Sequence, residues 1–345
     1  MSIPTENDYV VTSDNQNFQL GKKLGKGGEG IVYRVVNKPN LLVKIYQESK
    51  RRDRKGFLNL EHKIKGFETF YDKIFRHLCP EVCWVQKAVY FGGTFQGYIC
   101  RYVSGISLEQ WLNKRWKSKN KDDRDIQIIA IKIAKIVACL HDLKLPNGKL
   151  YPILVGDLQP QNILVDSKLN VSIIDSDSFE IGEQACNVQF QIYVSPERLS
   201  NPNIKREANE ENYVLAYLFF QMMMYNFNIQ PYNHIGGPGS HVECVKKGYF
   251  GYVRDNGKRI KEVYYKRWKQ FSPELQDCFK RAFHDTHPAQ NPSGQLQRYK
   301  PQHWAQVFEN NLKNGYYTRN RFAYSYIWIC VAVLIVAIIL LIALC

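Results

Sequence analysis

The sequence VGDLQPQNILVDSKLNVSIIDSD, residues 155–177, contains two short apolar runs joined by a polar turn. The runs, residues 163–165 and 171–174, are rich in Ile, Leu and Val, which predicts a pair of short strands. Asp157 precedes the first run, Asn162 comes five residues later, and Asp175 directly follows the second run. Carboxylate and amide oxygens bind Mg²⁺, and a carboxylate can accept a hydroxyl proton. The stretch therefore predicts a site that holds Mg²⁺ on a phosphate chain.

The bulk composition is that of a folded chain with basic character. At 345 residues, it is long enough for one large domain or two lobes with ample core. The formal net charge of +15 favours acidic partners, which include phosphates, nucleic acid and anionic membrane surfaces. The nine cysteines lack metal-binding spacing, so we interpret them as reduced cytosolic thiols.

The last part of the chain is strongly apolar. Residues 326–344 carry no charged side chain, and 19 residues make about 28 Å of helix, which matches a bilayer core. Lys313, Arg319 and Arg321 precede this segment, so the positive-inside rule places the preceding domain in the cytosol. No N-terminal signal peptide is visible. We expect a tail-anchored, single-pass membrane protein with residues 313–325 as a basic and aromatic juxtamembrane linker.

The remaining chain divides by its periodicity into a β-rich part and a helical part. Residues 1–15 read as a polar leader. Residues 16–104 predict strands near residues 18–24, 31–36, 41–46, 85–91 and 97–103, with one helix near residues 56–76. In residues 105–312, the pattern predicts one helix that begins at Ser107. It predicts further helices at residues 125–141, 213–225, 273–283 and 301–312.

A glycine loop joins the first two predicted strands. Its pattern, G-x-G-x-x-G-x-V at residues 25–32, lets backbone N–H groups approach phosphate oxygens. Because the loop does not open a helix, it fails the context test for dinucleotide binding. Lys44 lies on the next predicted strand and needs an anionic partner, which nucleotide phosphates would supply. Glu61, in the following helix, could orient Lys44 through an ion pair.

In this order, the glycine loop, strand lysine, helix glutamate, Asp-x4-Asn and second Asp resemble the eukaryotic-type protein kinase family. Further markers follow. Ser195-Pro196-Glu197 resembles the A-P-E that closes the activation segment, and Arg298 resembles the arginine that pairs with its glutamate. Glu211 occupies the place of the helix-capping acid of the family. The resemblance covers residues 16–312 and implies a bilobal α+β fold, with a β-rich N-lobe (16–104) and a helical C-lobe (105–312), plus the C-terminal transmembrane helix.

The resemblance also implies ATP and Mg²⁺ as cofactors and gives each residue a role. Asp157 would accept or orient the substrate hydroxyl, with Lys44 and Glu61 as the other catalytic residues, while Asn162 and Asp175 would hold Mg²⁺. Residues 100–103 would form the hinge that binds adenine. The expected nucleotide contacts are Leu24, Gly25, Lys26, Gly27, Gly28, Glu29, Gly30, Val32, Lys44, Arg101 and Val103.

Three residues depart from the usual motifs of the family. Gly156 stands where H-R-D has arginine, so the pocket for a phosphorylated activation loop is expected to be missing. Gln159 replaces the catalytic-loop lysine, and Asp177 replaces the glycine of D-F-G. The motifs G-D-L-x-P-x-N and D-x-D-S-F resemble a divergent, mainly bacterial branch of the family, in which these departures are a variant rather than decay.

The predicted function is membrane-anchored transfer of the ATP γ-phosphate to protein serine or threonine hydroxyls. The alternative is a nucleotide-binding or inactive pseudokinase that acts as a membrane-tethered scaffold. Small-molecule phosphotransferases share G-D-L-x-x-x-N but lack a regular glycine loop and the S-P-E/arginine pair, so they are less favoured. The basic runs at residues 50–55 and 114–121 have no accompanying recognition module, so no nucleic-acid partner is expected.

Overall fold

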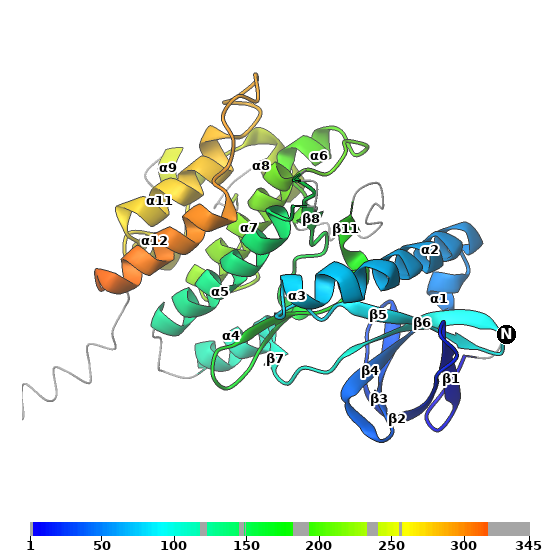
Figure 1. Cartoon of the computed structure of the whole chain (residues 1–345). Coiled ribbons are helices and arrows are strands. Elements are labelled where there is room, and N and C mark those ends of the chain that lie inside the picture. Colours follow the sequence, from blue (N-terminus) through cyan, green and yellow to red (C-terminus); the bar gives the residue numbers. More distant parts are fainter. Residues whose placement is uncertain are drawn as a thin grey trace, which may run out of the picture.

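The computed structural model describes residues 3–117, 123–144, 148, 150–181, 193–232, 241–254 and 257–316. A β-rich N-lobe and a helical C-lobe lie on either side of a connection near residue 104, as Figure 1 shows. Within the described residues, no helix has the length and apolar character needed to cross a membrane. The predicted transmembrane helix at residues 326–344 lies outside the described residues.

The N-lobe is a closed antiparallel barrel. Its strands follow the order β1 (Tyr9–Thr12), β2 (Asn17–Lys26), β3 (Gly30–Val35), β4 (Lys38–Tyr46), β6 (Thr94–Arg101) and β5 (Val85–Phe91). Alternate side chains of these strands point inward and form a small core that includes Leu20, Val43, Val89 and Ile99. All five predicted strand regions of the N-lobe are confirmed.

Strand β1 shows that the prediction of a polar leader at residues 1–15 was wrong for residues 9–12. Val10 is fully buried and pairs with Phe18 of β2, while Val11 pairs with Tyr90 of β5. The strand therefore bridges the two open edges of the sheet and closes the barrel. Closure removes exposed strand edges, which gives this short segment a structural reason to be ordered.

One long helical segment packs against the barrel. Helix α1 (Glu48–Arg51) leads into α2 (Arg54–Phe70), which continues through a π-helical turn (Tyr71–Phe75) into α3 (Arg76–Leu78). Asp53 caps α2 by accepting a hydrogen bond from the Gly56 N–H group. Ile64 and Phe67 are buried on the inner face of α2, so this helix covers β5 (Figure 1). The predicted helix near residues 56–76 is confirmed.

The C-lobe is built around α7 (Ala208–Met223), which is buried at most of its positions. Its longest other helices are α4 (Leu108–Lys117), α5 (Asp123–His141) and α12 (Pro301–Lys313), and α5 and α12 run side by side (Figure 1). The shorter helices are α6 (Pro196–Ser200), α8 (His241–Lys247), α9 (Gly251–Arg254), α10 (Glu262–Trp268) and α11 (Pro273–Lys280), which continues into a π-helical turn (Arg281–Asp285). Aromatic rings of Phe220, Phe279 and Trp304 meet at the centre of this core.

Two small sheets lie at the junction of the lobes. Strands β9 (Ile163–Val165) and β10 (Val171–Ile173) form the predicted pair, with β7 (Ile106–Ser107) beside β9. Strand β8 (Ile153–Leu154) pairs with β11 (Glu180–Ile181). Short 3-10 turns at Pro160–Asn162 and Ser176–Ser178 lead into β9 and follow β10. These turns place polar residues of the 155–177 stretch at the junction between the lobes.

Candidate active site

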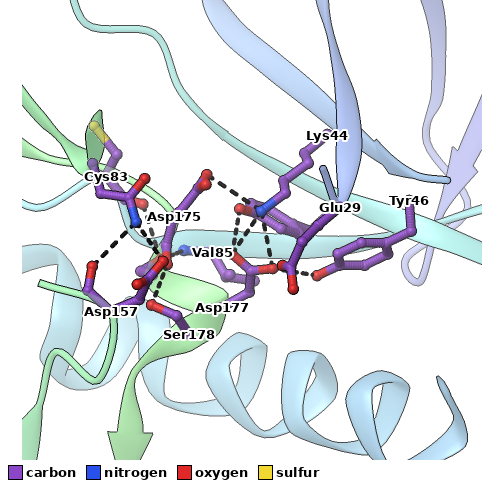
Figure 2. A network of polar contacts seen from close by, with 12 residues as sticks. Glu29, Lys44, Tyr46, Cys83, Val85, Asp157, Asp175, Asp177 and Ser178 are labelled. Carbon is purple, nitrogen blue, oxygen red and sulfur yellow. Dashed lines mark hydrogen bonds and ion pairs between the residues drawn. The ribbon is translucent and has the colours of Figure 1, made fainter. Parts of the chain in front are cut away.

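Lys44 projects from the barrel wall toward Asp175 and Asp177 (Figure 2). In the strand register, it lies between Val32 of β3 and Tyr98 of β6. A β-carbon added at Gly97 would lie 1.8 Å from the carbonyl oxygen of Lys44, so only glycine permits the two strands to approach here. Glycine at position 97 therefore allows β6 to lie close enough to β4 at Lys44 for the two strands to pair.

Two carboxylates from the segment after β10 meet the Lys44 amine. Lys44 Nζ lies 3.3 Å from Asp175 Oδ1 and 3.2 Å from each carboxylate oxygen of Asp177. The hydroxyls of Tyr46 and Tyr98 also donate to Asp177, at 2.7 and 2.8 Å. Figure 2 shows Lys44, Tyr46 and Asp177 converging on one point. The glycine of the usual kinase motif is thus replaced by a buried acid with four short contacts.

The predicted Lys44–Glu61 ion pair was wrong for this structure. Glu61 instead forms an ion pair with Lys65 at 2.8 Å and accepts a hydrogen bond from the Tyr90 hydroxyl at 3.1 Å. Within the described residues, the ion-pair partners of Lys44 are Asp175 and Asp177. The physical reason is local, since the i,i+4 lysine on α2 satisfies Glu61 on its own helix. The sequence marked Asp177 only as the residue in place of the D-F-G glycine and gave no signal that it would meet Lys44.

The ionisation of this cluster follows from burial and from its charges. Burial disfavours a charged lysine, but the Asp175 and Asp177 carboxylates outweigh it and raise the pKa of Lys44. Burial alone would raise the pKa of Asp177, yet the Lys44 charge and the two tyrosine hydroxyls lower it. Burial and Asp177 raise the pKa values of Tyr46 and Tyr98, so both hydroxyls stay protonated and act as donors.

Asp157 is held by the two amide side chains that follow it. Gln159 Nε2 and Asn162 Nδ2 both donate to Asp157 Oδ2 at 2.8 Å. Among the described residues, Oδ1 of Asp157 has no hydrogen-bond partner, so it is free to meet a substrate hydroxyl. Burial, followed by the Asp175 and Glu29 charges, raises the pKa of Asp157, and the two amides oppose this shift. A raised pKa makes this carboxylate a better proton acceptor than an ordinary aspartate.

The backbone beside Asp157 is supported from the C-lobe core. Gly156 has a φ of 74°, a left-handed conformation that glycine adopts without strain. Its N–H group donates to Glu211 Oε1 at 3.0 Å, and His141 Nε2 lies 2.7 Å from Glu211 Oε2. Glu211 is 3% exposed and sits in the first turn of α7. Glu211 was predicted to stand in the place of the family's helix-capping acid, but the cap position of α7 is Glu207, and Glu211 instead accepts from the backbone beside Asp157.

The residues predicted to hold Mg²⁺ have suitable chemistry. Asn162 uses its Nδ2 atom on Asp157, which leaves its Oδ1 oxygen as a potential ligand. The Asp175 side chain is 37% exposed to the cleft and has one oxygen away from Lys44. Within the part of the chain that the structure describes, no three His, Cys, Asp or Glu side chains gather as a metal site. Mg²⁺ commonly takes one or two protein oxygens together with substrate phosphates and water, and Asn162 and Asp175 could supply two such oxygens.

The predicted nucleotide contacts lie along one wall of the cleft. Of the residues in the glycine loop, Gly25, Gly27 and Gly28 are open, since an added β-carbon would meet nothing within 4 Å. Gln47 donates to the carbonyl groups of Gly27 and Gly28, and Lys50 pairs with Glu29, so the next segment supports the loop. The open space around these glycines lets phosphate oxygens approach the backbone of the loop.

The other predicted nucleotide contacts differ in whether the side chain or the backbone is available to a nucleotide. The Leu24 side chain is 45% exposed on β2, and Val32 pairs directly with Lys44 in the strand register. The Arg101 side chain donates to the carbonyl group of Pro80. The adenine contacts expected of Arg101 and Val103 are made by backbone groups, which this side-chain bond does not involve. Lys26 and Gly30 lie at the two ends of the loop, on β2 and β3.

Arg206 is a residue that the sequence gave no reason to single out. Its Nη1 atom donates to the Gly156 carbonyl at 3.1 Å and forms an ion pair with Glu180 of β11 at 3.2 Å. The guanidinium therefore links the backbone before Asp157 to the strand after the D-x-D segment. It lies beside the position where the usual motif would place an arginine, which here is Gly156.

The S-P-E marker and its arginine pair as predicted. Arg298 Nη2 lies 2.8 Å from Glu197 Oε1, and the Arg298 side chain is nearly fully buried. Ser195 caps α6 by accepting from the Arg198 N–H group. The ion pair joins α6 to the segment before α12. It therefore fixes the start of α6 to the C-lobe.

Comparisons with known proteins agree with this geometry. The model of the protein kinase domain family matches residues 18–293. The chain is 27% identical over 273 residues to protein kinase YegI of Escherichia coli K12, which covers 73% of this chain and 39% of that protein. It is 26% identical over 216 residues to the "Probable cAMP-dependent protein kinase catalytic subunit" of Encephalitozoon cuniculi, which covers 60% of each chain. The chain thus spans about two fifths of the length of the YegI relatives that it matches.

Proposed function

The chain belongs to the protein kinase domain family, and from this premise we propose that it transfers the γ-phosphate of ATP to serine or threonine hydroxyls of a protein. The observation that carries the proposal is the arrangement of Asp157. Its Oδ2 atom is held by Gln159 and Asn162, while its other oxygen faces the cleft without a partner among the described residues. An acid held in this way can orient a hydroxyl for attack and accept its proton.

The remaining residues of the site supply positioning and charge. The open glycine loop offers backbone N–H groups to the phosphates, and Lys44 offers a buried positive charge to them. Asn162 and Asp175 would hold Mg²⁺, which would neutralise charge on the phosphate oxygens. Phosphoryl transfer requires little covalent chemistry from the protein, so these electrostatic roles are sufficient for the reaction.

A phosphotransfer assay tests the proposal. The full chain, purified in a mild detergent, is incubated with radiolabelled ATP, Mg²⁺ and a serine- and threonine-containing protein such as casein. We expect labelling of the chain itself or of the added protein, and its loss in Asp157→Asn and Lys44→Met. Phosphoamino-acid analysis then separates serine and threonine from tyrosine. A wild-type chain that transfers no phosphate, with both variants unchanged, would refute the proposal.

The alternative of an inactive, membrane-tethered scaffold makes a different prediction in the same preparation. A scaffold that binds no nucleotide would show no change in thermal unfolding when ATP and Mg²⁺ are added. A kinase is stabilised by a ligand that binds only its folded state. The combination of an open loop, a buried lysine and an acid oxygen without a partner among the described residues favours the enzyme.

The proposal includes a membrane-spanning helix at residues 326–344, outside the described residues. Its support is compositional, because 19 uncharged residues match the bilayer core and the basic residues that precede them favour a cytosolic kinase domain. Deletion of residues 326–345 should move the protein from sedimented membranes to the soluble fraction. Continued sedimentation with membranes would show that these residues are not the anchor.

A further inference from the structure

We propose that Asp177, rather than a glutamate of helix α2, is the carboxylate that positions Lys44 for the phosphates of ATP. The inference rests on the proposed function, because it assigns a positioning residue to the same site. The hydroxyls of Tyr46 and Tyr98 complete the arrangement. We call this arrangement, in which Asp177, Tyr46 and Tyr98 hold Lys44 between the barrel wall and the D-x-D segment (residues 175–177), the lysine anchor.

The contacts of Asp177 leave it no capacity for another partner. Its Oδ1 atom meets Lys44 Nζ at 3.2 Å and the Tyr98 hydroxyl at 2.8 Å. Its Oδ2 atom meets Lys44 Nζ at 3.2 Å and the Tyr46 hydroxyl at 2.7 Å. Lys44 and Asp177 are each 6% exposed. Asp177 is therefore a fully satisfied buried acid, whereas Asp175 keeps an oxygen open to the cleft.

The three donors to Asp177 share one face of the barrel wall. Lys44 and Tyr46 are two residues apart on β4, so their side chains point to the same side of the sheet. Tyr98 is directly opposite Lys44 on β6. A single carboxylate placed over this face can therefore meet all three groups.

The backbone of the N-lobe holds Asp177 over this face. The neighbouring Ser176 is fully buried, and its hydroxyl accepts a hydrogen bond from the Val85 N–H group and donates to the Cys83 carbonyl, both at 2.9 Å. These contacts join the D-x-D segment to the start of β5 (Figure 2). The position of the acid thus depends on the backbone of residues 83–85.

Helix α2 has no matching contact to offer. Glu61 is engaged with Lys65 and Tyr90, which turns it toward β5 and away from the lysine. Lys44 has three N–H donors, so it can keep Asp177 as a partner while it donates to a phosphate. We therefore expect that ATP binding depends on Asp177 and not on Glu61.

A double-mutant cycle on ATP affinity tests this assignment with the full chain. The dissociation constant of ATP with Mg²⁺ is measured by calorimetry for wild type, Asp177→Asn, Glu61→Gln and Lys44→Met. A hydrogen bond to a charged group contributes about 1.5–3 kcal/mol, so Asp177→Asn should weaken binding by roughly 10- to 100-fold. Glu61→Gln should change it by less than about twofold. In the Lys44→Met background, Asp177→Asn should add less than about twofold, because it acts through the lysine.

Two results would overturn the inference. One is a loss of affinity in Glu61→Gln that equals the loss in Asp177→Asn. The other is a full additional loss from Asp177→Asn in the Lys44→Met background, which indicates a general structural role. If thermal unfolding shows that Asp177→Asn does not fold, Tyr46→Phe replaces it, since this change removes one donor and keeps the ring. Tyr46→Phe should weaken ATP binding by about three- to tenfold, and unchanged binding would count against the anchor.

The same measurements separate this inference from the proposed function. If the wild-type chain binds ATP but transfers no phosphate, the proposed kinase activity fails while the affinity cycle still decides the role of Asp177. If it transfers phosphate and Asp177→Asn binds ATP normally, only the anchor is refuted. A wild-type chain that binds no nucleotide overturns both.

Discussion

Replacing Arg206 with alanine tests how the loop that carries Asp157 is held in place. In the wild-type structure, the guanidinium joins the Gly156 carbonyl to Glu180, and its side chain is 10% exposed while that of Glu180 is 15% exposed. The substitution removes the ion pair and the hydrogen bond together. It leaves Glu180 without its cation and Gly156 without this donor.

The expected loss of stability follows from the partial burial of the pair. Breaking a fully buried pair by removing one partner costs about 3–5 kcal/mol. Here a cavity of about 760 Å³ lies directly beside both side chains, so water can reach Glu180 after the substitution. We therefore expect a smaller loss, about 2 kcal/mol, which corresponds to a fall in melting temperature of roughly 4–8 °C.

The effect on catalysis is measured as the initial rate of phosphate transfer. A loosened Gly156 displaces the neighbouring acid, and we expect a rate about tenfold lower, equivalent to about 1.4 kcal/mol. Lys205→Ala is the matched control, because Lys205 is an exposed neighbour with the same charge. It should change neither the rate nor the melting temperature appreciably.

The same contact predicts that activity does not require phosphorylation of the segment before α6. Arg206 already has a carboxylate partner within the chain, so no phosphate is needed to engage it. Phosphatase treatment of the wild-type chain should therefore leave its rate within about twofold. Two results would refute the reasoning: Arg206→Ala that behaves like Lys205→Ala, or a rate that collapses on dephosphorylation.

Three further changes have defined outcomes. Arg298→Met should lower stability by about 2 kcal/mol in thermal unfolding, because it removes a nearly fully buried guanidinium from its pair with the partly exposed Glu197; a melting temperature equal to wild type would contradict this. Gln159→Ala should reduce the transfer rate about tenfold with ATP affinity unchanged, because it frees Asp157 on one side; an equal loss of affinity would point to a different role. Gly97→Ala should fail to give folded protein by circular dichroism, since its β-carbon would lie 1.8 Å from a carbonyl oxygen of β4; a normal spectrum would show that the strands can separate.

Most elements of secondary structure could be predicted, because their signals are local. The short apolar runs of β9 and β10 and the apolar faces of α5 and α12 depend on neighbours within one element. Strand β1 was missed because four residues with two buried side chains give too short a pattern. Its pairing with β5 is a contact between distant parts of the chain, which no local pattern reports.

The amino-acid sequence by itself determined the order of the chemical groups: an open glycine loop, Lys44 on a strand, then Asp157, Asn162 and Asp175 around a strand pair. Spacing within one loop or one strand is enough to predict such groups, since the backbone allows few arrangements over so short a distance. Their identity and spacing were also sufficient to suggest ATP and Mg²⁺.

Only the tertiary structure decided which carboxylate meets Lys44. Glu61 and Asp177 are both acids of the right type, but Asp177 lies 133 residues away in sequence and reaches the lysine only because the two lobes pack together. Within α2, Glu61 finds a partner one turn away. The placement of Arg206 beside Gly156 is of the same kind. Long-range partners depend on the packing of whole elements, and the residues that form them carry no mark of that pairing in the sequence.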